Sequence, residues 1–214
     1  MKNLDYREYY RRNLPHIQPR GVTFLVNFRL AGSLPREILE ELRAEADQHE
    51  EMFSKSRYSK EKLLARDKEQ RRLIGKWDEA LHRSQSGHSF LKEDRIAKIV
   101  SDSISYHDGE WFDVEAYCIM PNHVHLVLTP YEKSDTSDFS LTQIMHNVKR
   151  NSAKQANLVL GRKGSFWQHE SYDHFARDES ELKRIIEYVL LNPVNAGLVE
   201  NWQDWKWTTC KYNL

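Results

Sequence analysis

The chain has 214 residues, of which 39% are hydrophobic and 30% are charged. These proportions exclude a disordered chain and are typical of a soluble globular domain with a sizeable core. No apolar run approaches the roughly 18 residues that a membrane helix needs, and the charged N-terminus lacks the apolar stretch of a signal peptide. Only Cys118 and Cys210 are present, so no disulfide framework is implied. We therefore expect a cytoplasmic protein with no membrane partner.

The balance of charge excludes a protein that is coated with positive charge. The 32 basic residues equal the 32 acidic ones, which argues against non-specific binding of duplex DNA by the whole surface. The distribution is uneven, however, because residues 139–169 contain five basic side chains and no acidic one. Any surface for nucleic acid is therefore expected to be local.

The first half of the chain predicts one strand followed by helices. Residues 22–28 are apolar, β-branched and aromatic, as in a strand. After Pro35, charged residues dominate positions 36–83 and apolar ones are thinly spread, which indicates long or paired helices with solvated faces. A further helix is expected at about 92–106.

The second half changes to a strand period and then returns to helices. Residues 111–120 and 123–129 predict two antiparallel strands, joined by a turn at Pro121 and Asn122. A helix is expected at 141–160 with Ser140 as its N-cap and Gly161 as its stop. Residues 166–176 are extended or irregular. A last helix, capped by Asp178 or Ser180, is expected to end near Asn192 because Pro193 follows. The order suits an α+β fold with a central antiparallel sheet and helices on one face.

His123 and His125 form the first candidate site. Side chains alternate across a strand, so both imidazoles project to one face while Val124, Leu126 and Leu128 point to the other. Neutral imidazole is a common metal ligand, and two rings at this spacing can share one ion. Zinc hydrolases use the same spacing, so the pair alone does not define the chemistry.

Tyr188 in the last helix is the second candidate. Leu182, Ile185, Ile186, Val189 and Leu190 form the apolar stripe of that helix. Tyr188 falls outside this stripe and shares a side with Glu181, Arg184 and Asn192, the last of these at i+4. A tyrosine in polar company is expected of a reactive phenol in a cleft, although a surface-boundary tyrosine has the same pattern.

Three sequence blocks together resemble a known superfamily. YCIMPNHVHLVL at 117–128 resembles the histidine motif of the HUH endonucleases. FWQHESYDHFARDESELKRIIEYVLLNPVNAGLV at 166–199 is similar to the C-terminal block of REP-associated tyrosine transposases, which are single-tyrosine enzymes. WQDWKWTTCKY at 202–212 is similar to their Trp-rich tail. The resemblance covers about 112–212 and extends plausibly to 22–28.

The resemblance implies a fold, a reaction and a set of site residues. It implies a ferredoxin-like HUH fold over 1–214, here with a charged helical insertion at about 40–89. It implies that His123, His125 and Asn192 hold a divalent metal, Mg²⁺ or Mn²⁺, and that Tyr188 attacks a DNA phosphodiester to form a phosphotyrosine intermediate. The implied partner is single-stranded or hairpin DNA, and the implied location is the cytoplasm in association with the nucleoid.

Several further residues are candidates for contact with DNA or for support of the site. The basic residues of 139–169 lie just before an aromatic pair that is suited to stacking on unpaired bases. The candidates for DNA contact are Lys149, Arg150, Lys154, Trp167 and Arg184. His174 is a candidate for a supporting residue, which would contact the metal-binding or catalytic side chains without touching the substrate.

Two other functions remain open at the level of sequence. One is a catalytically silent regulator that binds nucleic acid on the same fold. The other is an unrelated zinc hydrolase built on the histidine pair, which needs a third ligand and a base that the sequence does not nominate. A monomer and a homodimer are both compatible with the pattern.

Overall fold

The computed structural model describes residues 9–11, 15–54, 60–84, 87–132 and 139–212. The chain divides into two compact units. One joins the described residues up to Ala31 with those from Ser89 onward, and the other is Gly32–His88. The histidine pair and Tyr188 both belong to the first unit.

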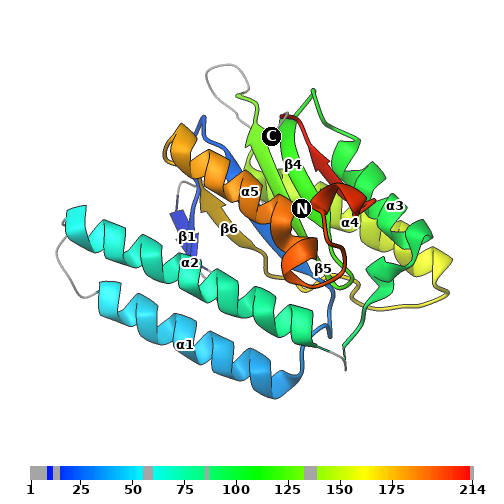
Figure 1. The fold of residues 1–214 in the computed structure, drawn as a ribbon, viewed down its shortest axis with the longest axis horizontal. Helices are drawn as coiled ribbons and strands as arrows, with labels where there is room; N and C mark the ends of the chain where they lie inside the picture. The colour runs from blue at the N-terminus through cyan, green and yellow to red at the C-terminus, as the bar shows by residue number, and fades with distance from the viewer. Residues whose placement is uncertain (1–8, 12–14, 55–59, 85–86, 133–138, 213–214) are drawn as a thin grey trace. The chain divides into compact units, whose positions relative to one another are not determined.

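The first unit is built on a five-stranded antiparallel sheet (Figure 1). The strand order is β6-β3-β5-β4-β7, so β5 lies at the centre. In this order the strands are Tyr172–Phe175, Phe24–Arg29, His123–Pro130, Phe112–Ile119 and Thr208–Cys210. A separate two-stranded sheet pairs β1 (Tyr9–Arg11) with β2 (Pro15–Ile17). The predicted α+β fold with a central antiparallel sheet is confirmed.

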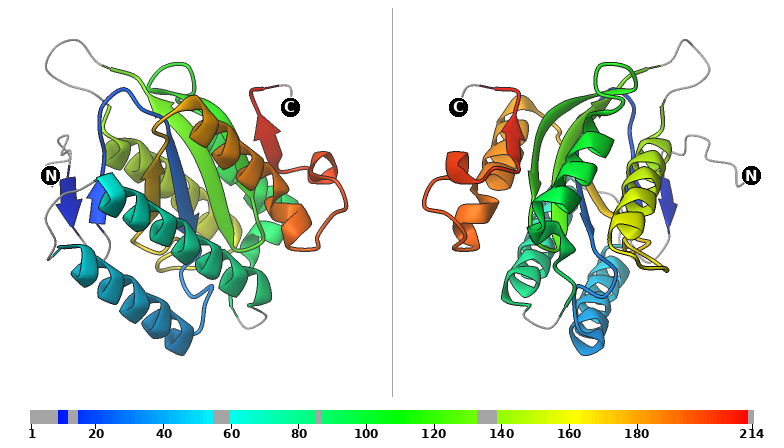
Figure 2. Two further views of the ribbon diagram at one scale, coloured as in Figure 1. Left: turned by 60° about the vertical axis from the view of Figure 1, so that its left-hand side comes forward. Right: turned by 90° about the vertical axis from the view of Figure 1, so that its right-hand side faces the viewer.

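Helices cover both faces of this sheet (Figure 2). On one face, α3 (Asp94–Ser105) and α4 (Leu141–Val159) pack against Val124 and Leu126. On the other face, α5 (Glu179–Asn195) packs against Val127. Short 3₁₀ turns occur at Phe90–Lys92 and Trp202–Asp204. The expectation of helices on one face is wrong, because the central strand carries apolar side chains on both faces and each needs cover.

The predicted helix start signals agree with the structure. Ser140 caps α4, and its side chain accepts a hydrogen bond from the backbone N–H of Gln143 at 3.2 Å. Asp178, rather than Ser180, caps α5 and accepts from the backbone N–H of Glu181 at 2.7 Å. An acidic cap at this end also complements the helix dipole.

The end of α5 differs from the prediction. The helix continues through Pro193 to Asn195, so the expected end near Asn192 is wrong. Proline removes one backbone donor but keeps a helical φ, and near a helix end it leaves the last turn intact. The stop is Gly197, whose φ of 66° suits glycine, and whose N–H donates to the carbonyl oxygen of Val194.

The second unit is a pair of helices. They are α1 (Arg36–Ser54) and α2 (Lys60–Arg83), and residues 55–59 between them lie outside the described part. Leu34, Leu42 and Leu81 form a small core between the helices. Glu45 of α1 bonds Arg72 and Lys76 of α2, each at 2.6 Å, and these bonds lower the pKa of Glu45. The prediction of paired, highly charged helices is therefore confirmed. None of the described helices is long and apolar enough to cross a membrane.

Candidate active site

The central strand β5 presents the two histidines on the face that α5 covers. Val124, Leu126 and Leu128 lie in the core on the opposite face, as strand alternation requires. Asn27 of β3 stands directly across from His125 in the sheet register. Both imidazoles are buried. The predicted projection of the two rings to one face agrees with this arrangement.

Two asparagine side chains orient the imidazoles from behind. The Nδ1 atom of His125 lies 2.9 Å from Oδ1 of Asn27, and the Nδ1 atom of His123 lies 2.7 Å from Oδ1 of Asn122. A carbonyl oxygen only accepts hydrogen bonds, so these two contacts favour the tautomers that are protonated at Nδ1. This pattern, in which one ring nitrogen is held so that the other is left to bind, is typical of metal-ligating histidines.

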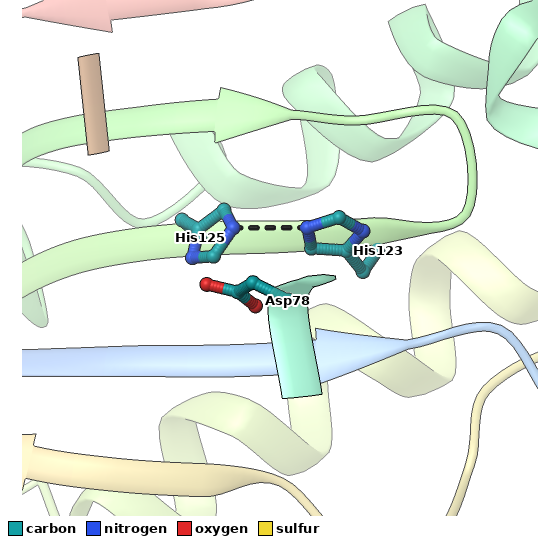
Figure 3. Close-up of side chains that lie close together, drawn as sticks. All are labelled: Asp78, His123 and His125. Atoms are coloured by element: carbon teal, nitrogen blue, oxygen red, sulfur yellow. Dashed lines mark hydrogen bonds between the residues drawn. The ribbon is translucent and has the colours of Figure 1, made fainter. Parts of the chain in front are cut away.

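The two remaining nitrogens face each other across a short gap (Figure 3). The Nε2 atoms of His123 and His125 are 2.9 Å apart. Without a metal, one Nε2 can donate a hydrogen bond to the other. In the tautomers with both protons on Nδ1, each Nε2 instead presents a lone pair, and a cation between the two would be bound by both. At metal–nitrogen distances of about 2.1 Å and an angle of about 90°, two ligand nitrogens lie about 3.0 Å apart. The pair is therefore compatible with a divalent metal ion. Asp78, which Figure 3 also labels, belongs to the second unit, Gly32–His88.

Tyr188 of α5 lies beside this pair. Its ring meets the ring of His125 edge to face, with centroids 5.6 Å apart and an interplanar angle of 88°. Its hydroxyl oxygen is buried and has no hydrogen-bond partner within the described ranges of the chain. A buried hydroxyl without a partner is costly, and such groups are common where a ligand is to be bound. The structure thus brings Tyr188 and His125 together.

Asn192 and Arg184 lie on the same helix at different depths. Asn192 follows Tyr188 by about one turn and is buried, with 1% of its surface exposed. Arg184 is exposed, and its guanidinium donates to the hydroxyl of Ser180 at 3.0 Å. Asn192 therefore shares the buried side of α5 with Tyr188, whereas Arg184 lies in solvent.

His174 supports the start of α5 rather than the histidine pair. Its Nε2 atom is 3.0 Å from the carboxylate of Glu181, which also accepts two hydrogen bonds from the guanidinium of Arg177. Burial acts to raise the pKa of Glu181, but the bonds from Arg177 and His174 outweigh it and lower the pKa to about 2. This network ties β6 to the first turn of the helix that carries Tyr188.

Two of the predicted DNA contacts have structural roles instead. Trp167 is buried, packs edge to face on Phe28, and donates its indole N–H to Ser152 at 2.9 Å. Its ring is thus part of the core, and the prediction that it stacks on bases is wrong for this conformation. Lys149 donates to the carbonyl oxygens of Gln168 and His169 at 2.7 and 3.0 Å, which commits its ammonium to the protein.

The remaining basic candidates are at the surface. Arg150 and Lys154, one turn apart on α4, are both exposed. Neither makes a hydrogen bond or ion pair that involves the described residues. Both are therefore accessible to an anionic partner.

Asn27 and Asn122 are the site residues that the sequence reasoning missed. Asn27 is the one polar residue in the apolar run from Phe24 to Phe28, and its parity places it on the histidine face of the sheet. Asn122 directly precedes His123, and its place after Pro121 indicates only a turn. A polar side chain inside an otherwise apolar strand is the signal that identifies such a residue.

The elements that carry the histidine pair and Tyr188 lie in a stretch of the chain that is similar to known transposases. The family model for IS200-like transposases matches residues 87–191, which include β4, β5, α4 and Tyr188. Residues 87–191 are therefore similar to IS200-like transposases.

Within that class, the relatives are REP-associated tyrosine transposases. The chain is 28% identical over 103 residues to one named so in Haemophilus influenzae, a match that covers 46% of this chain and 58% of the relative. It is 30% identical over 98 residues to another from Escherichia coli K12, covering 46% of this chain and 54% of the relative. The matches thus span little more than half of each relative. The resemblance inferred from the sequence motifs is confirmed.

A solved structure shares the fold. It is a REP-associated tyrosine transposase bound to a REP hairpin, with a TM-score of 0.52 and 16% sequence identity. The match covers 94% of this chain and 81% of that one. This similarity supports the fold assignment.

Proposed function

We propose that the protein is a single-stranded DNA endonuclease and strand transferase in which Tyr188 is the nucleophile. It would act as one transposase-like domain over 1–214, with about 40–89 as a charged helical insertion. The proposed substrate is a DNA hairpin with a single-stranded flank. The hairpin bound to the structural relative supports this choice. A chromosomal DNA substrate would put the protein at the nucleoid.

One observation carries the proposal. The Tyr188 hydroxyl is buried without a partner in the described part of the chain, while the Tyr188 ring lies against His125 of the histidine pair. A phosphate that entered between them would meet the phenol on one side and the imidazole nitrogens on the other. These groups come from a helix and a strand that are far apart in the sequence, which favours a shared role.

The proposed reaction is a transesterification. The Tyr188 oxygen attacks phosphorus, a phosphotyrosine ester forms with the 5′ end of one strand segment, and the 3′ oxygen leaves and takes up a proton as a 3′-hydroxyl. Attack of another strand's 3′-hydroxyl on the same ester restores a phosphodiester and the phenol. The ester conserves the bond energy, so no nucleotide cofactor is needed.

The protein's own groups prepare the site for this step. A phenol has an ordinary pKa of about 10 and reacts poorly when protonated. Asn27 and Asn122 hold the two imidazoles with Nε2 toward the site, and Asn192, one turn after Tyr188 on α5, is the proposed third ligand. Mg²⁺ or Mn²⁺ bound by His123, His125 and Asn192 would polarise the phosphate oxygens and offset the developing charge.

The test is a labelled-strand assay. A DNA hairpin with a single-stranded flank is incubated with the protein and Mn²⁺, and denaturing gels are run on two substrates that are labelled at opposite ends. The 3′ label should stay with the protein, whereas the 5′ label should leave on a fragment with a 3′-hydroxyl.

Two variants identify the nucleophile. Tyr188→Phe should abolish the denaturant-resistant band and leave hairpin binding largely intact. Tyr172→Phe is the matched control, because Tyr172 stands opposite Asn27 in the sheet register and so lies on the same sheet face. If the adduct still forms with Tyr188→Phe but not with Tyr172→Phe, the nucleophile is Tyr172 and the proposal for Tyr188 is wrong.

A catalytically silent regulator on the same fold is the alternative. It predicts hairpin binding without cleavage across Mg²⁺, Mn²⁺ and other divalent ions. The presence of the proposed nucleophile and histidine pair in one place favours the enzyme.

A further inference from the structure

We propose that a groove beside α4 binds the phosphate backbone of the DNA substrate, on the face of the sheet opposite to the histidines. The groove has a volume of about 360 Å³ and lies between α4 and the segment Gly164–Ser171. We call it the α4 groove. The proposal rests on the proposed function in one respect, the choice of DNA as the ligand.

The position of the groove follows from the sheet register. Val26 and Asp173 line it, and these two residues are partners across β3 and β6. Val26 packs in the core beneath α3 and α4, whereas its neighbour Asn27 faces the histidine pair. Because side chains alternate along a strand, the α4 groove and the histidine pair lie on opposite faces of one sheet. Variants in the α4 groove can therefore change DNA binding without altering the residues proposed to carry out the reaction.

Three nitrogen-bearing side chains converge on the groove without internal partners. His146 and Arg150 come from α4, and His169 comes from the facing segment. All three are exposed, and none makes a hydrogen bond or ion pair with any residue that the structure describes. Arg150 is the permanent cation of the set. The carboxylate that lines the groove, Asp173, accepts a hydrogen bond from Gln18 at 3.2 Å.

The facing wall is fixed by bonds that do not use these three side chains. Lys149 holds the segment through Gln168 and His169 and also donates to the Ser171 hydroxyl at 3.0 Å. Asn157 donates to the carbonyl oxygen of Gly164 at 2.9 Å. The groove is therefore formed before any ligand binds. Lys149 holds its wall in place, whereas the guanidinium of Arg150 is available to bind a ligand.

Charge and size together indicate a nucleic acid backbone. The surrounding stretch, residues 139–169, has five basic side chains and no acidic one. A guanidinium with flanking imidazole donors suits the oxygens of a phosphodiester. The volume is at the lower end of the range for small-ligand sites, as expected for a groove that takes a nucleotide-sized part of a longer strand.

The test compares Arg150→Gln with Lys154→Gln. Lys154 is the matched control because it is an exposed cation one turn further along α4 and does not line the groove. Binding of a fluorescent hairpin with a single-stranded flank is measured by anisotropy in EDTA, over a series of salt concentrations. Loss of one phosphate contact lowers affinity about five- to eightfold at about 0.1 M salt and reduces the salt slope by about 0.7–0.9. We expect this for Arg150→Gln and a much smaller effect for Lys154→Gln.

Two further variants test the same groove without relying on loss of a side chain. Arg150→Lys keeps the charge and should retain most of the affinity. Ser165→Glu places a negative charge on an exposed lining residue and should weaken binding more than Arg150→Gln does. Melting temperatures close to that of the unmodified protein establish that all four variants are folded.

The outcomes separate this proposal from the enzymatic one. If Arg150→Gln binds with unchanged affinity and salt slope, or if Lys154→Gln loses as much as Arg150→Gln, the α4 groove is not the backbone site. Tyr188→Phe should bind the hairpin with the affinity and salt slope of the unmodified protein. An adduct in Tyr188→Phe would contradict the proposed reaction but leave the Arg150 result standing.

Discussion

Replacement of Asn27 by alanine is the most informative single change at the histidine pair. The substitution removes the oxygen 2.9 Å from Nδ1 of His125, and with it the bond that fixes the ring's orientation and favours a deprotonated Nε2. Loss of such a supporting partner typically lowers metal affinity by about 10- to 100-fold, or about 1.4–2.7 kcal/mol. Asn27→Asp keeps an acceptor at this position and should retain the affinity.

The assay is a titration of Mn²⁺ followed by electron paramagnetic resonance, which reports the free ion directly. Asn147→Ala is the control, because Asn147 is also half-buried but bonds the carbonyl oxygen of Gln143 within α4. It should bind Mn²⁺ as the unmodified protein does. Equal affinities for Asn27→Ala and Asn147→Ala would refute the argument that the asparagine prepares His125 for a metal.

Two other predictions concern stability. The folded-state pKa of Glu181, about 2, lies below its ordinary value of 4.5, so the ionised carboxylate stabilises the fold above about pH 4.5, and this contribution is lost as the pH falls toward 2. The melting temperature of the unmodified protein should therefore fall more between pH 4.5 and 2 than that of Glu181→Gln. If the two melting temperatures fall equally with pH, the bonds from His174 and Arg177 do not have this role. Lys149→Met removes a donor to three oxygen atoms and should lower the free energy of unfolding by about 1–3 kcal/mol in urea titrations, whereas an unchanged midpoint would show that its bonds are dispensable.

Much of the fold follows from local sequence signals. The strands β4 and β5 and the cap at Ser140 are set by residue types within a few positions, so periodicity and capping rules identify them. The end of α5 was not predictable in this way, because Pro193 is tolerated in a last turn that Gly197 closes. The two-sided cover of the sheet depends on which distant helices pack where, and short apolar strands do not specify that.

The candidate site divides along similar lines. His123, His125 and Tyr188 could be proposed from their patterns together with the motif resemblance, and the structure brings Tyr188 and His125 side by side. Lys149 and Trp167 were misinterpreted because a basic or aromatic residue has the same sequence pattern whether it faces solvent or bonds the protein. Their carbonyl and hydroxyl partners, such as Ser152, become neighbours only after the chain has folded.

Peptide mapping of the covalent adduct tests the central claim most directly. After reaction with a hairpin substrate and Mn²⁺, nuclease and protease digestion followed by mass spectrometry locates the residue that carries the nucleotide. The proposed chemistry predicts a nucleotide phosphoester on the peptide of α5, at Tyr188. A modified peptide that contains Tyr172 or another tyrosine in place of Tyr188 would contradict it.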